Sequence, residues 1–107
     1  MANPAKKPSH WQSEAQTIKG NVDTLIAKMQ KNNKFTPTRD ALEELARHII
    51  ALINTYHTQV QPFETHLKAA IIDLTEVPEM SEQMQRIAFQ TALKDASAKI
   101  QLFLNCF

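Results

Sequence analysis

A single glycine, Gly20, is the feature that most restricts how this 107-residue chain can fold. Tight hairpin turns rely on residues that adopt positive φ, and phosphate-binding loops rely on a backbone without a Cβ atom. Because the one glycine lies inside a helical pattern, such turns and loops are not expected. The sequence instead indicates helices whose ends are marked by prolines, which stand at Pro4, Pro8, Pro37, Pro62 and Pro78.

Apolar residues recur at steps of three or four along the first half of the chain, which is the spacing of one helix face. The first series is Trp11, Ala15, Ile18, Val22, Leu25 and Met29. The second is Leu42, Leu45, Ile49, Leu52 and Tyr56, widened by Ala46, Ile50 and Ile53. Ser9 is the expected N-cap of the first helix, and Thr36 followed by Pro37 is expected to open the second.

A third and a fourth series follow the same spacing. The third is Val60, Phe63, Leu67, Ala70 or Ile71, and Leu74. The inward positions expected in the last helix are Met84, Ile87, Ala88, Ala92, Ala96, Ile100 and Phe103, with Phe89, Leu93 and Leu104 beside them. Either Ser81 or the Pro78–Glu79 pair is expected to start that helix. We therefore predict an all-α, antiparallel four-helix bundle with helical segments at about 9–32, 37–58, 62–76 and 79–105. Residues 1–8 are predicted to form a flexible arm, and residues 9–107 a single domain.

Pro62 leaves two arrangements open for the second and third segments. The apolar stripe continues past it, so the two segments could be one long helix kinked at Pro62. A continuous helix over 38–76 would be ~58 Å long, and its overhang would need a partner to cover it. This favours a sharp kink or turn near 58–62.

The charge balance argues against a nucleic-acid binder, because 12 Lys and Arg face 11 Asp and Glu. No signal peptide and no apolar run long enough to span a membrane are expected. Cys106 is the only cysteine, so no intrachain disulfide can form. We expect a cytoplasmic protein, with export by a secretion system that does not read a signal peptide left open.

Candidate catalytic and metal-binding residues do not combine into a site. His48, His57 and His66 are nine residues apart, so that neighbours in this series point to opposite sides of a helix. Cys106 has no base beside it, and the glutamate pairs lie on polar helix faces. No enzymatic activity, metal or cofactor is therefore predicted.

Apolar residues exceed the needs of a small core in the second helix and in the C-terminal segment. Exposed apolar surface on proteins commonly marks a partner surface. The predicted function is a non-catalytic protein–protein interaction module, a small helical regulator, adaptor or inhibitor that forms a homodimer, with segment 79–105 as the first candidate interface. A secreted bacterial effector or effector inhibitor remains as an alternative. A further alternative is an amphipathic binder of lipid or nucleic-acid surfaces, which would use Lys6, Lys7, Lys28, Lys31 and Lys34. The predicted partner-binding residues are Ile50, Ile53, Ile100, Leu102, Phe103, Leu104 and Phe107.

Overall fold

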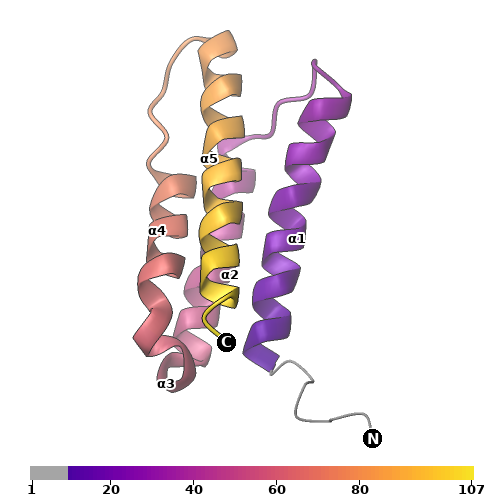
Figure 1. Ribbon diagram of the computed structural model, residues 1–107. Coiled ribbons are helices and arrows are strands. Elements are labelled where there is room, and N and C mark those ends of the chain that lie inside the picture. Colours follow the sequence, from indigo (N-terminus) through magenta and orange to yellow (C-terminus); the bar gives the residue numbers. More distant parts are fainter. Residues whose placement is uncertain (1–9) are drawn as a thin grey trace, which may run out of the picture.

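Four helices pack side by side in the computed structural model, which describes residues 10–107 (Figure 1). They are α1 (His10–Lys31), α2 (Arg39–Thr55), α4 (Glu64–Thr75) and α5 (Glu82–Leu104). Successive helices run in opposite directions, and α5 lies between α1 and α4 while α2 closes the bundle behind it. This confirms the predicted all-α bundle. The arm predicted for residues 1–8 falls outside the described residues.

The core contains the stripes that the spacing predicted for the first two helices. In α1, Trp11, Ala15, Ile18, Val22 and Met29 are buried, and Leu25 packs against them in a half-buried position. In α2, the buried residues are Leu42, Leu45, Ala46, Ile49, Leu52 and Ile53. Ile50 departs from the prediction because its side chain is 42% exposed on the outer side of α2.

The start of α2 lies two residues later than predicted. Thr38, not Thr36, is the N-cap: its backbone is extended, and its hydroxyl accepts a hydrogen bond from the Ala41 amide at 3.1 Å. Pro37 is buried immediately before this cap. The cap satisfies one of the free amides at the start of the helix, which explains why the helix begins here.

The chain reverses direction between α2 and α4, so the alternative of one long helix is wrong. α2 ends at Thr55, with Tyr56 as its C-cap. The turn is completed by the short helix α3 (His57–Val60) and the 3-10 helix η2 (Gln61–Phe63), which contains Pro62. Figure 1 shows this reversal at the lower end of the bundle. The proline opposes a continued α-helix at this point, as the sequence indicated.

The last two helices differ in length. α4 has 12 residues, or about 18 Å, whereas α5 has 23 residues, or about 35 Å. An irregular segment, residues 76–81, runs from the end of α4 to the start of α5 (Figure 1). The first turns of α5 therefore extend beyond the end of α4, and α5 begins after Ser81 rather than at residue 79.

The predicted inward face of α5 is wrong over its first turns. Met84 and Ile87, expected in the core, are 53% and 55% exposed. Phe89 and Leu93, expected at its edge, are buried together with Ala92, Ala96, Ile100 and Phe103. The inner face of α5 is thus rotated relative to the prediction over its first turns.

Candidate protein-interaction surface

The outer face of α5 carries three exposed apolar residues, whereas α4 carries Ile72, which is 51% exposed. Met84, Ile87 and Leu102 are each exposed by half or more of their surface. Thr91, Asp95 and Ala98 are also exposed and complete the same face. We call these six residues the α5 stripe: Met84, Ile87, Thr91, Asp95, Ala98 and Leu102. α1 and α4 flank α5 but do not cover this side of it.

The predicted partner-binding residues fall into two groups in the structure. Ile53, Ile100 and Phe103 are buried in the core of the chain itself, so their side chains are not available at its surface. Leu102, Phe107 and Ile50 are exposed, and Leu104 is half-buried. Binding of a partner through the exposed group stays a prediction.

The C-terminal segment is apolar because it closes one end of the bundle. Phe107 folds back onto Trp11, Phe63 and Phe103, with ring centroids 4.2, 4.8 and 5.1 Å away and edge-on geometry in each pair. Such edge-to-face pairs are favourable beyond the area they bury. We call this cluster the aromatic end. This packing accounts for much of the apolar character of the C-terminal segment.

The opposite end of the bundle is held by two arginines and is called the arginine end. Arg86 of α5 donates a hydrogen bond to the Met29 carbonyl at 2.6 Å, near the end of α1. Arg39 of α2 donates to the Val77 carbonyl at 2.5 Å, and its guanidinium lies 5.5 Å from the centre of the Phe89 ring. These bonds satisfy carbonyl groups at a helix end and in the 76–81 segment.

A polar contact in the middle of the bundle joins α1 to α5. Ser97, buried on α5, donates to the Asp23 carboxylate at 2.5 Å, and Lys19 forms an ion pair with the same group at 2.9 Å. Burial raises the pKa of Asp23, but the hydrogen bonds from Lys19 and Ser97 and the charge of Lys19 outweigh it. The net result is a pKa below the ordinary value of 3.8.

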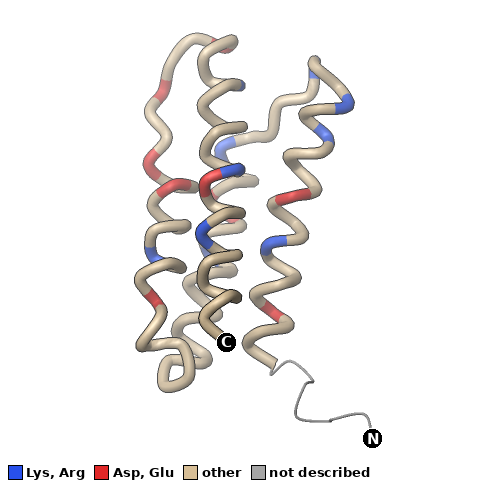
Figure 2. The backbone as a smooth tube through the Cα atoms, in the orientation of Figure 1, with Lys and Arg blue, Asp and Glu red and all other residues tan. Residues whose placement is uncertain are grey.

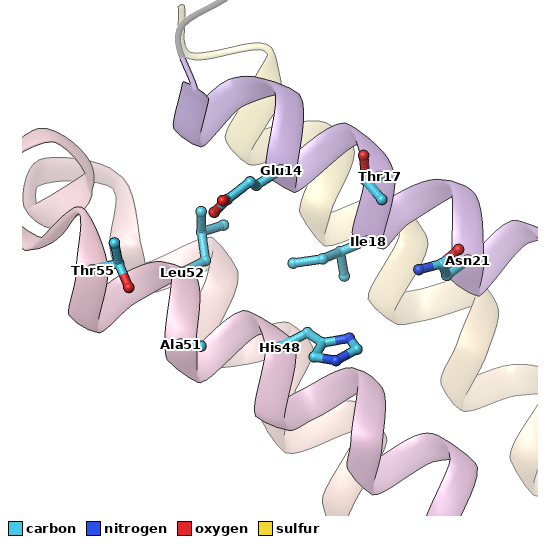
Figure 3. A pocket seen from close by; sticks show the side chains of 8 residues that line it. All are labelled: Glu14, Thr17, Ile18, Asn21, His48, Ala51, Leu52 and Thr55. Atoms are coloured by element: carbon cyan, nitrogen blue, oxygen red, sulfur yellow. The ribbon is translucent and has the colours of Figure 1, made fainter.

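A groove of about 390 Å³ lies between α1 and α2 (Figure 3). Ile18 and Leu52 form an apolar floor, and its rim is polar, with Glu14, Thr17 and Asn21 on one side and His48 and Thr55 on the other. The Tyr56 hydroxyl donates to Glu14 at 3.5 Å. Partial burial raises the pKa of Tyr56, and the Glu14 carboxylate raises it further. The groove holds no nucleophile paired with a base.

Charges are distributed unevenly over the bundle (Figure 2). Lys residues mark the upper end of α1, whereas Asp and Glu predominate along α4 and the segment after it. Lys28 and Lys31 lie in the last turn of α1, where they complement the helix dipole. Asp73 of α4 is paired with Lys99 of α5 at 2.5 Å. Lys6 and Lys7, which the surface-binding alternative also requires, lie outside the described residues.

The residues singled out for chemistry do not converge. His48 pairs with Glu44 at 3.3 Å on the surface of α2, and His57 is exposed on α3. Over residues 10–107, no three His, Cys, Asp or Glu side chains are grouped so that they could hold a metal ion. Cys106 is free and exposed, and its thiol lies 3.3 Å from the Leu102 carbonyl. No helix in the same range is long and apolar enough to cross a membrane.

The sequence reasoning missed the α5 stripe as a surface, although it found Leu102. Its positions follow steps of three and four, like those of the buried face, so their spacing alone predicts a helix face without saying which side it occupies. The two polar members, Thr91 and Asp95, are the signal that distinguishes this stripe from the core.

Comparison with known proteins gives no relative. No protein-family model matches the chain, and neither a curated protein nor a solved structure is significantly similar to it.

Proposed function

We propose that this protein is a non-catalytic protein–protein interaction module that binds through the outer face of α5. The observation that carries the proposal is the exposure of Met84, Ile87 and Leu102 along one uncovered helix face. Each of these side chains leaves about half of its surface in contact with water, and removing apolar surface from water is favourable. A partner that covers the stripe would gain this free energy.

Other exposed apolar residues support the proposal less well. Ile50 and Phe107 are exposed by 42% and 46%, but Ile50 stands alone on α2 and Phe107 packs within the aromatic end. Scattered apolar residues of this kind are normal on protein surfaces. The α5 stripe differs because three apolar side chains share one face of a rigid helix.

The test compares complexes formed by the tagged full chain and by two charge variants in lysate of the cell that produces it. We expect Met84→Glu combined with Ile87→Glu to remove the complexes, because a charge would be buried in the interface. Ile50→Glu, a matched change on α2, should leave them intact. The complexes are separated from free chain by size and their masses are determined.

Two results would contradict the proposal. One is that the wild-type chain sediments as a monomer and retains no partner. The other is that the α5 double variant forms the same complexes as the wild type. Loss of the complexes in Ile50→Glu alone would move the binding surface to α2.

A further inference from the structure

The α5 stripe is nearly symmetric about Leu93. Met84 and Leu102 lie nine residues before and after it, Thr91 and Asp95 two residues before and after it, and Ile87 and Ala98 six before and five after. A helix face with this symmetry matches itself when a second copy runs in the opposite direction. From this pattern we infer that the partner bound by the α5 stripe is a second copy of this chain, in an antiparallel arrangement with the two-fold axis beside Leu93.

This inference rests on the proposed function and specifies its partner. In a two-fold dimer the same patch is used by both copies, so each contact occurs twice. Met84 of one copy would face Leu102 of the other, and Ile87 would face Ala98. These two pairs would place apolar contacts at both ends of the seam, which spans about 27 Å between Met84 and Leu102.

The polar centre of the stripe is also complementary to itself. Thr91 would face Asp95 of the second copy, so that the threonine hydroxyl can donate to the carboxylate, once on each side of the axis. Lys94, also exposed, lies three residues after Thr91 on the same helix. It would therefore stand about one turn from the Asp95 carboxylate of the second copy and add an opposite charge there. Neither the Thr91 side chain nor the Asp95 side chain forms a hydrogen bond or ion pair with another residue of 10–107. The central polar pair would select the antiparallel register, because a parallel seam would oppose Asp95 to Asp95.

A small alanine supports close approach of the two helices. Ala98 is exposed opposite the position of Ile87, so a large and a small side chain would meet. Such alternation lets facing helix surfaces interlock. Leu93 itself is buried and points into the core of its own chain, which leaves the axis free of a large side chain.

Self-association is measured by sedimentation of the purified full chain over a range of concentrations. We expect a dimer of twice the chain mass. Met84→Glu should raise the dissociation constant of the dimer about tenfold or more, because it places a charge against Leu102 of the second copy. Ile50→Glu, on α2 and also exposed, serves as the matched control and should leave the dimer unchanged. Far-UV circular dichroism confirms that both variants keep their helical content.

The register is tested with cysteines in a Cys106→Ser background. Met84→Cys combined with Leu102→Cys should form intermolecular disulfides under mild oxidation, because the two positions face each other in the antiparallel dimer. Each single variant should not, because its two copies would lie about 27 Å apart. Efficient crosslinking of a single variant would overturn the antiparallel register.

A monomer at all concentrations would overturn this inference. If that monomeric chain loses a complex with another protein on Met84→Glu, the proposed function survives and only the identity of the partner is wrong. If the wild-type chain forms neither a dimer nor a complex with another protein, both fail.

Discussion

The two ends of α5 are fixed by opposite kinds of interaction. At the aromatic end, Phe103 is fully buried and contacts the rings of Trp11 and Phe107. At the arginine end, Arg86 anchors the helix to a carbonyl of α1, while Met84 and Ile87 stay exposed. One end is closed by apolar packing; the other is tied by directed hydrogen bonds.

The difference follows from the lengths of the neighbouring helices. α4 ends at Thr75, so the first turns of α5 have no second helix on that side, and the 76–81 segment takes its place. Apolar packing needs a neighbour with matching surface, whereas an arginine can reach isolated carbonyl groups with its long side chain. Exposed apolar side chains remain at both ends, Met84 and Ile87 at the arginine end and Leu102 at the aromatic end, but the aromatic end contributes more to the stability of the fold.

Phe103→Ala tests the larger contribution of the aromatic end. The side chain is completely buried, so its loss leaves a cavity and should lower the free energy of unfolding by about 3–5 kcal/mol. Leu102→Ala, at the next position but half exposed, should cost much less. Denaturant unfolding followed by circular dichroism measures both. Similar losses for the two variants would show that the aromatic end is not the stable part of the bundle.

Arg86→Met tests the arginine end with a smaller expected effect. The variant keeps an unbranched side chain but leaves the Met29 carbonyl without the Arg86 donor, which should cost about 1–3 kcal/mol. The Asn32 carbonyl still accepts from the Phe35 amide at 3.0 Å. Arg47→Met is the control, because its ion pair with Glu44 is exposed to water and should contribute little to stability. Hydrogen exchange of the amides in residues 82–89 should speed up in Arg86→Met alone. Unchanged exchange there would contradict the anchoring role.

The comparison also shows what the sequence could predict. Spacing identified the buried face of α1 correctly, because Trp11, Ala15, Ile18, Val22 and Met29 form one apolar series with no competing series on the helix. Pro62 also predicted the position of the reversal, because its ring disfavours a continuing α-helix whatever the tertiary packing around it. Features determined by local geometry were therefore predictable.

α5 was predicted less well because it carries two apolar series. Which of them faces inward is set by how α5 packs against α1 and α4, and this is a tertiary property that one sequence does not display. Arg86 occupies part of the inward side since it binds carbonyls of a segment more than fifty residues away. Ile100 and Phe103 were assigned to a partner surface for the related reason that the tail looked apolar on every side, before its packing against Trp11 and Phe63 was known.

The smallest expected effect concerns the middle of α5, where the contact with α1 changes from apolar to polar at Asp23 and Ser97. Because the pKa of Asp23 lies below 3.8 in the folded state, its ionised form stabilises the fold above that pH, and this contribution is lost as the pH falls through the folded pKa. Asp23→Asn lacks the charge at every pH. At neutral pH it should be less stable than the wild type by less than about 1 kcal/mol, since the carboxylate is partly exposed to water. Urea unfolding at several pH values measures the difference, which should shrink as the pH falls below 3.8. A difference that stays constant would mean that the charge of Asp23 does not contribute to stability.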